Sequence, residues 1–479
     1  MANSSSNTRP GWQSWLRDER FWQIALQVIL IIIVGATFSY LFGNLSRNIN
    51  QQFSFNFLKN PAGFGISENL LGYQPQDSYA KVVQAGIINS LRLVFVGIIT
   101  ATLVGVAAGV ASFSDNWLVY KLSRVYISLV RNIPLLLQLF LWFYAVILAL
   151  PSEQQSPLVL PNADRIWLIA SNKQINIVGP NLPDSVWVGL MLLVVTALLI
   201  GLMWRAINTF VQGRFAGGLA GWVSRVGQAA IIAGVLFFSY FLLFSNSAED
   251  RLFFQGALIS LFTNLEGLWI LALMAALVAI VVLYKQRIKA MLERGANGKV
   301  YLYAMIVIAI AMLAIILFAF NWTPPELRAI EGNTRIVARG GLVMTGSYAA
   351  ALIGLTFYTG AFIAEIVRAG IQSVSRGQWE AARSVGLSNG QAMQLVIFPQ
   401  SLRVIIPPLN SEFANLAKNS SLAFAVGYPE LYNISNTTLN QTGKPIEVFL
   451  VMMGTYLLLN LLISLNMNQL NKAVQFKER

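Results

Sequence analysis

Two residue types are missing from this chain of 479 residues, which contains no cysteine and no histidine. Without cysteine there are no disulfides, no thiol nucleophile and no thiolate metal ligand. Without histidine there is no Ser-His-Asp triad, no imidazole ligand for zinc or haem, and no histidine proton relay. These absences exclude most metal-dependent and acyl-transfer chemistry, so we expect neither a catalytic site nor a metal site.

Charged residues are also scarce. Only 11% of the residues are charged, 56% are hydrophobic, and the mean hydropathy is +0.61. An ordinary soluble domain carries about 25% charged residues, which it needs to cover its surface. The composition therefore excludes an ordinary cytosolic enzyme and a disordered chain, and it predicts an all-α polytopic membrane protein.

Ten apolar segments are long enough for a helix to cross a hydrocarbon core of about 30 Å. The weakest of them contains Glu412 and Lys418, and we include it because a helix inside a bundle tolerates polar groups. The ten predicted transmembrane helices cover residues 22–42, 88–112, 124–150, 186–204, 226–244, 267–284, 301–320, 346–367, 406–427 and 447–466.

The basic residues are unevenly distributed among the connections, and they explain a net charge of +13 without any nucleic acid. With both termini in the cytoplasm, the predicted inner segments hold about twice as many Lys and Arg residues as the outer ones. This is the bias expected of a membrane protein whose basic loops stay inside. We therefore expect a multi-pass protein of the bacterial inner membrane with both termini cytoplasmic.

Composition also changes along the chain. The four spans of a central region carry almost no charge, which is typical of helices that face lipid, whereas the spans before and after it are richer in Gly, Ser, Asn and charge. The predicted segments are 1–85 (cytoplasmic tail, first span and outer loop), 86–150 (two core helices), 151–185 (outer loop), 186–320 (inserted lipid-facing spans), 321–345 (outer loop) and 346–479 (remaining core helices).

The longest predicted cytoplasmic connection, residues 371–405, has the signals of two short helices. Gly386 stands where the first helix would end, and Ser388 is placed to cap the second. Two adjacent alanines in the first helix leave a flat face that could lie in a groove of another protein. The residues of this loop that we expect to contact a partner are Glu380, Ala381, Ala382, Gly386 and Pro399.

The pattern Glu-Ala-Ala, three residues, Gly386, and Pro399 thirteen residues later resembles the EAA loop of ABC importer permeases. The resemblance extends over residues 80–150 and 340–470 and is closest to the large general L-amino-acid permeases of the polar amino-acid uptake family. Its other motifs are Arg131-Asn132-Ile133-Pro134, Tyr358-Thr359-Gly360, Glu365-Ile366-Val367-Arg368-Ala369-Gly370 and Leu416-Ala417-Lys418-Asn419-Ser420-Ser421-Leu422.

The resemblance implies a five-helix permease core plus extra spans, and a division of labour among subunits. A second homologous permease would complete the pathway as a heterodimer, with a homodimer as the alternative. An ABC ATPase dimer and a periplasmic amino-acid-binding protein would be the other partners. The chain has no G-x-x-x-x-G-K-[ST] phosphate loop. ATP and Mg²⁺ would therefore act in the ATPase, and this chain would bind no cofactor. Residues 371–405 would couple the ATPase to the permease.

The weakest predicted span carries polar groups on one face. Glu412, Asn415 and Asn419 are three and four residues apart, so they share a helix face, and Lys418 lies nearby. A charge inside a membrane costs roughly 2.5–3.5 kcal/mol on insertion scales. Two interpretations stay open: the face holds the ammonium or carboxylate of a substrate, or Lys418 pairs with Glu412 or Glu365 and only fixes helix packing.

Several nearby positions have structural interpretations. Glu365 is expected to be a gate or packing residue that borders the pathway, and Arg131 is expected to pack against the coupling loop. Arg92, near the outer mouth, is interpreted as a snorkelling side chain. Pro407 and Pro408 are expected to break the helix at the membrane surface.

The favoured function is import of polar or general L-amino acids from a periplasmic binding protein, driven by ATP hydrolysis elsewhere. An ion-gradient-driven secondary amino-acid transporter is one alternative, although it would need inverted repeats and has no use for the coupling loop. A non-transporting structural membrane subunit is the other. We further expect the outer loops over 43–85 and 151–185 to help form the docking surface for the binding protein.

Overall fold

A computed structural model gives the structure, and the chain divides into two units, Met1–Phe55 and Asn56–Arg479. The elements considered below belong to the second unit, apart from the short helix η1 (Phe55–Lys59), which begins at the last residue of the first. The structure describes residues 36–37, 40, 54–154, 157–160, 166–180, 182–183, 185–190, 192–193, 256, 259–294, 299–329 and 336–474.

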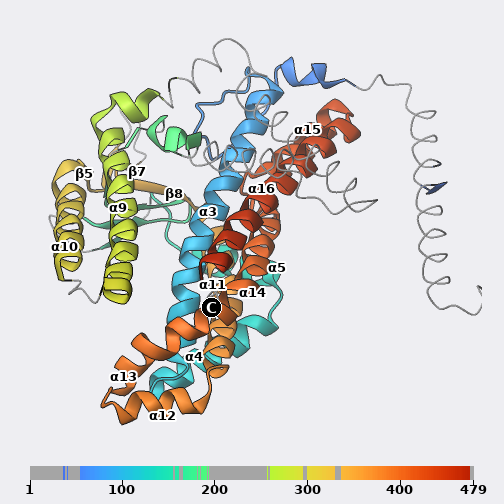
Figure 1. Cartoon of the computed structure of the whole chain (residues 1–479). Helices are drawn as coiled ribbons and strands as arrows, with labels where there is room; N and C mark the ends of the chain where they lie inside the picture. Colours follow the sequence, from blue (N-terminus) through green and yellow to red (C-terminus); the bar gives the residue numbers. More distant parts are fainter. Residues whose placement is uncertain are drawn as a thin grey trace, which may run out of the picture. The chain divides into compact units, whose positions relative to one another are not determined.

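Four long helices pack together as the core of the second unit (Figure 1): α3 (Tyr79–Ala111), α11 (Gly346–Gln372), α14 (Phe398–Asn419) and α16 (Pro445–Val474). The buried side chains shared by these helices are almost all aliphatic or aromatic. Each of the four overlaps a segment apolar enough to cross a membrane. The core predicted over 88–112, 346–367, 406–427 and 447–466 is therefore helical.

Small residues set the close approach of α3 to α11. Gly97, Ala101, Gly105 and Gly109 recur at every fourth position of α3, and all are buried. A Cβ atom added at Gly105 would lie 2.6 Å from the Cβ of Ile363 on α11. Small residues at this spacing let two membrane helices come together closely, since no side chain separates their backbones.

The predicted span over residues 124–150 is not one straight helix. It consists of α4 (Trp117–Asn132), followed by α5 (Leu135–Phe140) and η2 (Leu141–Ile147), with a bend of 110° between the two parts. Pro134 causes the break, because it has no N–H to donate and forces Ile133 into an extended backbone conformation.

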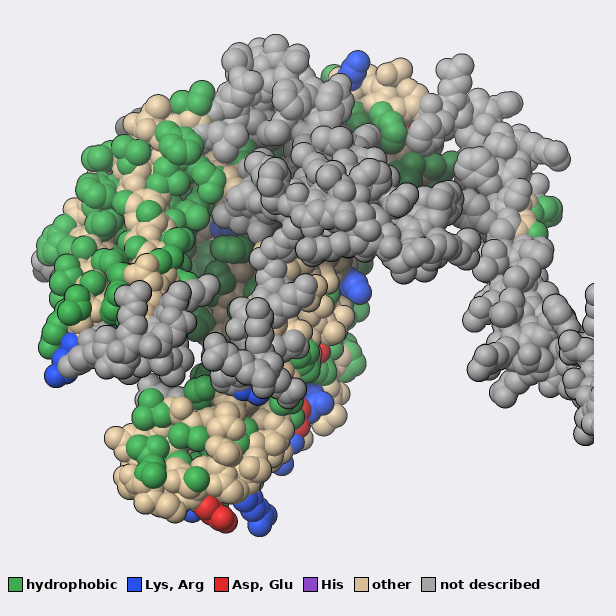
Figure 2. All heavy atoms as spheres, viewed as in Figure 1, with side chains coloured by type: hydrophobic (Ala, Val, Ile, Leu, Met, Phe, Trp, Pro, Cys, Tyr) green, Lys and Arg blue, Asp and Glu red, His purple; other side chains and the backbone are tan. Residues whose placement is uncertain are grey.

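Two further helices come from the predicted insertion: α9 (Leu265–Arg294) and α10 (Lys299–Ala314), which continues as η3 (Ile315–Ala319). No residue of α10 is buried, and hydrophobic side chains cover both helices in Figure 2. Within the described residues, six helical segments are long and apolar enough to span a membrane, or seven with the bent pair. The predicted span 226–244, and most of the spans 22–42 and 186–204, lie outside the described residues.

Short strands, which the sequence did not predict, occupy the two predicted outer loops around the insertion. β1 (Leu158–Leu160), β2 (Leu168–Ala170), β3 (Gln174–Ile177) and β8 (Leu342–Thr345) form one antiparallel sheet in that order. β4 (Gly179–Pro180) pairs with β5 (Trp322–Thr323), and β6 (Glu326–Ala329) pairs with β7 (Ile336–Arg339). Residues on either side of the insertion thus pair with one another.

The strand β8 runs directly into α11. Gln174 pairs with Thr345, the last residue of β8, and the Thr345 hydroxyl accepts a hydrogen bond from the Tyr348 backbone and so caps α11. The four-stranded sheet is therefore attached to the start of a core helix. At the opposite end of α11 lie the short helices α12 (Arg376–Ser384), α13 (Asn389–Ala392) and η4 (Met393–Ile397). Acidic and basic side chains gather near α12 in Figure 2.

Candidate functional site

The predicted coupling loop folds as two short helices joined by a tight turn, as the sequence indicates. α12 ends in a glycine cap, in which the Gly386 N–H donates to the Arg383 carbonyl and the Leu387 N–H donates to the Ala382 carbonyl. Gly386 has a φ of +83°, a conformation that favours glycine. The Ser388 side chain caps α13 in a capping box with Gln391.

One side of α12 packs against the protein and the other is free. Ala382 is only 3% exposed, and Trp379 packs against the core helices. Glu380 and Ala381 are exposed, and so is Val385, of which 76% of the surface is accessible. The flat alanine face expected from the sequence is therefore divided: Ala381 points outward, whereas Ala382 anchors the helix.

A direct contact joins α12 to the start of α14. The Gln400 side-chain amide donates a hydrogen bond of 2.9 Å to the Gln378 side-chain oxygen. Pro399 lies in the first turn of α14, where its missing N–H costs nothing. α12 is therefore joined to α14 by a side-chain hydrogen bond as well as by the chain between them.

The polar residues predicted for the pathway lie along the accessible side of α14. Asn415 and Lys418 are exposed, while Glu412 and Asn419 are partly buried. Among the described residues, neither Glu412 nor Lys418 forms an ion pair. Neither pairing considered for Lys418, with Glu412 or with Glu365, is therefore formed within the described residues.

Pro407 and Pro408 do not break the helix as predicted, since α14 continues through both. Their rings remove two backbone hydrogen bonds, which would run to the carbonyls of Arg403 and Val404. Both of these residues, like the two prolines, lie on the exposed side of the helix. The opposite side is held by packing against α11 and α16, which outweighs the local loss.

Glu365 binds two arginines on the surface of α11. Arg368 donates to it through Nε, at 3.0 Å, and through a second, terminal nitrogen. Arg131 lies 3.6 Å from the same carboxylate, and its guanidinium stands 5.3 Å from the centre of the Phe362 ring. Arg131 therefore contacts α11 rather than the coupling loop, contrary to the prediction.

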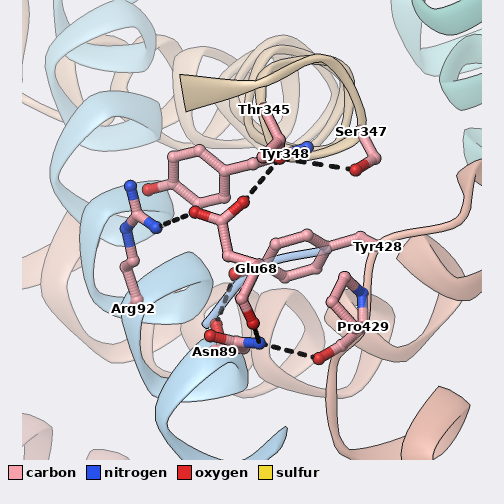
Figure 3. Close-up of polar contacts among 8 residues, drawn as sticks. All are labelled: Glu68, Asn89, Arg92, Thr345, Ser347, Tyr348, Tyr428 and Pro429. Carbon is pink, nitrogen blue, oxygen red and sulfur yellow. Dashed lines mark hydrogen bonds and ion pairs between the residues drawn. The ribbon is translucent and has the colours of Figure 1, made fainter. Parts of the chain in front are cut away.

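A buried polar cluster at the end of the bundle where α11 begins was not predicted (Figure 3). Glu68, 7% exposed, comes from the segment that precedes α3, and its carboxylate binds Arg92 and accepts a hydrogen bond of 2.6 Å from the Thr345 hydroxyl. The Arg92 guanidinium also lies over the Tyr348 ring, 4.1 Å from its centre. Arg92 is therefore the cation of a buried ion pair, and its interpretation as a snorkelling residue is wrong.

The same cluster reaches the loop that follows α14 and its 3-10 extension η5 (Ser420–Val426). The Asn89 side-chain amide donates both to the Glu68 carbonyl, at 3.2 Å, and to the Pro429 carbonyl, at 2.9 Å. The Tyr428 hydroxyl donates to the Asn89 carbonyl at 3.0 Å. In the sequence, Arg92 was the one residue that could have indicated this cluster, because a charge within a span needs a partner.

A second buried carboxylate, Glu430, caps α15 (Leu431–Thr442) just beyond this loop. It accepts hydrogen bonds from the backbone N–H groups of Tyr432, at 2.6 Å, and Asn433, at 2.8 Å, and from the Tyr456 hydroxyl, at 2.9 Å. Burial raises the pKa of Glu430 to about 7, although these hydrogen bonds oppose the shift.

Known proteins are similar in sequence to this chain over its whole length. The family described as "Binding-protein-dependent transport system inner membrane component" matches residues 298–476. The putative amino-acid ABC transporter permease protein YhdX of Escherichia coli is 34% identical over 485 residues, which cover 100% of this chain and 98% of that protein. The chain belongs to the family of amino-acid ABC transporter permeases.

Two other amino-acid ABC permeases align over 100% of this chain and 100% of their own length. The general L-amino acid transport system permease protein AapQ of Rhizobium johnstonii is 29% identical over 490 residues. The glutamate/glutamine/aspartate/asparagine transport system permease protein BztB of Rhodobacter capsulatus is 32% identical over 500 residues. The similarity therefore includes the insertion between the core helices, and is not confined to the coupling loop.

As an amino-acid ABC permease, the chain is a multi-pass subunit of an importer in the bacterial inner membrane. The protein is not an enzyme, since ATP hydrolysis belongs to a separate subunit of such importers. This membership decides against an ion-gradient-driven carrier and against a subunit with a purely structural role.

Proposed function

We propose that this permease pairs with a second, homologous permease to form a pathway for polar and general L-amino acids. A periplasmic binding protein delivers the amino acid, and two ATPase subunits that use ATP and Mg²⁺ drive its movement to the cytoplasm. The relatives named for general L-amino acids and for glutamate, glutamine, aspartate and asparagine support this substrate class.

The geometry of α12 carries the proposal. The helix presents Glu380, Ala381 and Val385 outward, while Ala382 holds it to the bundle. The helix follows the C-terminal end of α11. The hydrogen bond from Gln400 to Gln378 joins it to α14. An ATPase that moves α12 as a rigid body would therefore move the helix with the polar face.

The polar side of α14 supports the pathway. Exposed polar groups at the depth of an apolar span are costly when they face lipid. Asn415 and Lys418 would be covered if a second permease placed a corresponding face opposite them, with Glu412 and Asn419 at the margin. Glu365 lies on the neighbouring helix α11 and would border the same passage.

The test is to purify the tagged chain from its native membrane in mild detergent and identify the accompanying proteins by mass spectrometry. An ATPase, a second permease and an amino-acid-binding protein are the expected partners. Recovery of the chain alone, or only with copies of itself, would contradict the heteromeric importer.

Matched variants test the role of α12 in the same experiment. Val385→Asp places a charge on an exposed side chain, and Gly386→Ala strains the backbone by about 1–2 kcal/mol, because φ there is positive. Both should reduce recovery of the ATPase while the second permease remains. Gly390→Ala is the control, since an added Cβ there also meets open space and the backbone is not strained. Equal ATPase recovery from all three would show that α12 is not the contact.

A further inference from the structure

We propose that α4 lies along the inner surface of the membrane and binds anionic phospholipids through a stripe of basic side chains. The inference goes beyond the proposed import function, since it concerns the lipid around the permease and not the pathway through it. It rests on two stripes of exposed side chains on α4 and on the direction in which this helix crosses α11.

The two stripes run in parallel along α4. In each of them the members are spaced by four, three and four residues, so they follow one side of a helix with 3.6 residues per turn. The apolar stripe, of which 56% to 61% of each side chain is exposed, consists of Leu118, Leu122, Val125 and Leu129. The polar stripe, all of it exposed, consists of Trp117, Lys121, Arg124 and Ser128. The remaining side of the helix is buried against the bundle through Ser123 and Ile127.

Contacts at the two edges of the buried side show where each stripe points. The Tyr126 hydroxyl donates a hydrogen bond of 2.7 Å to the Phe357 carbonyl, near the middle of α11. Arg131 lies 3.6 Å from Glu365, two turns nearer the end of α11 that leads into α12. Around the helix, Tyr126 adjoins the apolar stripe and Arg131 continues the polar one. The apolar stripe therefore faces the middle of the bundle, and the polar stripe faces the end that carries α12.

The helix α4 lies across the bundle rather than along it. The Ser123 hydroxyl donates a hydrogen bond of 2.6 Å to the Ala108 carbonyl, at the level where α3 meets Val367 of α11. Arg131 then lies beside Glu365, only two residues from Val367. The two contacts are about 12 Å apart along α4 but only about 3 Å apart along α11. After the bend of 110°, α5 and η2 run back along α11. α4 is therefore placed as a helix parallel to the membrane surface would be.

The polar stripe carries positive charge that the described residues do not balance. α4 contains three basic residues and no acidic one. Arg131 and Arg368 already share Glu365. Lys121 and Arg124 form no ion pair within the part of the chain that the structure describes. The stripe therefore fits a partner with negative charge.

An anionic lipid surface fits both stripes at once. The head groups of phosphatidylglycerol supply negative charge for Lys121 and Arg124, and the acyl chains cover the apolar stripe on the deeper side. Trp117, which is 70% exposed, belongs to the residue type enriched where head groups meet acyl chains. A protein partner fits less well, because lysine is depleted from protein interfaces.

The experiment measures which lipids touch α4. The chain has no cysteine, so Val125→Cys gives it a single thiol on the apolar stripe, which is labelled with bimane. The purified assembly is placed in vesicles of phosphatidylcholine and phosphatidylglycerol, in which one lipid or the other carries a nitroxide on its acyl chain. The ratio of bimane quenching by the two nitroxide lipids gives the local preference for the anionic lipid. The assembly with the native permease, labelled in the same way, supplies the background from the other subunits.

We expect at least about a fivefold preference for phosphatidylglycerol at Val125→Cys, which is the effect of a single basic residue near an anionic surface. Replacing Lys121 and Arg124 together by glutamine should bring the ratio to about one. Lys299→Gln, which removes an exposed charge at the start of α10, is the matched control and should leave the ratio unchanged. Leu122→Cys is a second probe on the same stripe, in case Val125→Cys folds poorly.

A probe elsewhere shows whether the preference belongs to α4. Val307→Cys lies on α10, is 64% exposed and stands two turns from Lys299, the one charged residue of that helix. It should be quenched equally by the two lipids. The same preference at Val307→Cys as at Val125→Cys would contradict a site on α4.

Two other results would overturn the proposal. Quenching at Val307→Cys but by neither lipid at Val125→Cys would show that a protein, such as the second permease, covers α4. Equal quenching by both lipids at Val125→Cys, or a preference that survives the loss of Lys121 and Arg124, would show that these charges select no lipid. The measurement requires no transport, so a failure of amino-acid import would refute the proposed function and leave this result unaffected.

Discussion

Replacing Glu68 with glutamine should destabilise the end of the helix bundle where α11 begins. Glutamine keeps the size of the side chain and an oxygen that can accept from the Thr345 hydroxyl, 2.6 Å away. The hydrogen bond from Asn89 ends on the backbone carbonyl of residue 68, so it also survives. What disappears is the negative charge beside Arg92, whose side chain is only 13% exposed.

The size of the effect follows from these contacts. Removing one member of a buried ion pair costs about 3–5 kcal/mol, because the other charge stays buried without compensation. Arg92 keeps its position over the Tyr348 ring, 4.1 Å from the centre, and a desolvated contact of this kind contributes about 1–2 kcal/mol. We therefore expect Glu68→Gln to lower the free energy of unfolding by about 2–4 kcal/mol.

The assay is unfolding of the purified protein in mixed micelles by titration with SDS, followed by tryptophan fluorescence. Glu326→Gln is the matched control, because it breaks the exposed ion pair between Glu326, whose side chain is 49% exposed, and Arg328, whose side chain is 63% exposed. It should lower the free energy of unfolding by only about 0–1 kcal/mol. The double change Glu68→Gln with Arg92→Met should be less harmful than Glu68→Gln alone. Equal losses from Glu68→Gln and Glu326→Gln would refute the reasoning.

Two further predictions concern burial elsewhere in the bundle. Burial raises the pKa of Glu430 from an ordinary 4.5 to about 7, so the folded protein favours the protonated carboxyl. The contribution of Glu430 to stability is therefore greatest below about pH 4.5 and is lost as the pH rises through about 7. The thermal unfolding temperature should therefore fall between about pH 5 and pH 8, and it should fall less in Glu430→Gln. The same fall in both proteins would contradict this prediction. Gly105→Ala should cost about 1–3 kcal/mol, since its Cβ would collide with α11. Gly454→Ala, in open space on α16, should not destabilise the protein in the same measurement.

Features that depend on neighbouring residues could be predicted from the sequence. The core spans follow from the length of their apolar segments, and the coupling loop follows from Gly386 and Ser388, whose effects reach only a few residues along the chain. The bend at Pro134 has an equally local cause. It was missed because hydropathy, averaged over a long window, does not register a single proline.

Other features depend on contacts between distant segments. Thr345 is 277 residues from Glu68, and the two are joined by a hydrogen bond. The strand β3 pairs with β8 across the whole insertion, and each strand is too short to show a pattern of its own. No spacing rule brings such residues together, because their proximity results from how the helices pack.

The sequence by itself determined the class of protein, the core helices and the form of the coupling loop, since these depend on composition and on interactions within a few residues. Only the tertiary structure decided which charges meet. Arg131 was assigned to the coupling loop and Arg92 to the lipid interface, and both instead contact acidic residues on other segments. A buried or intramembrane charge requires a partner, but the identity of that partner is set by three-dimensional packing.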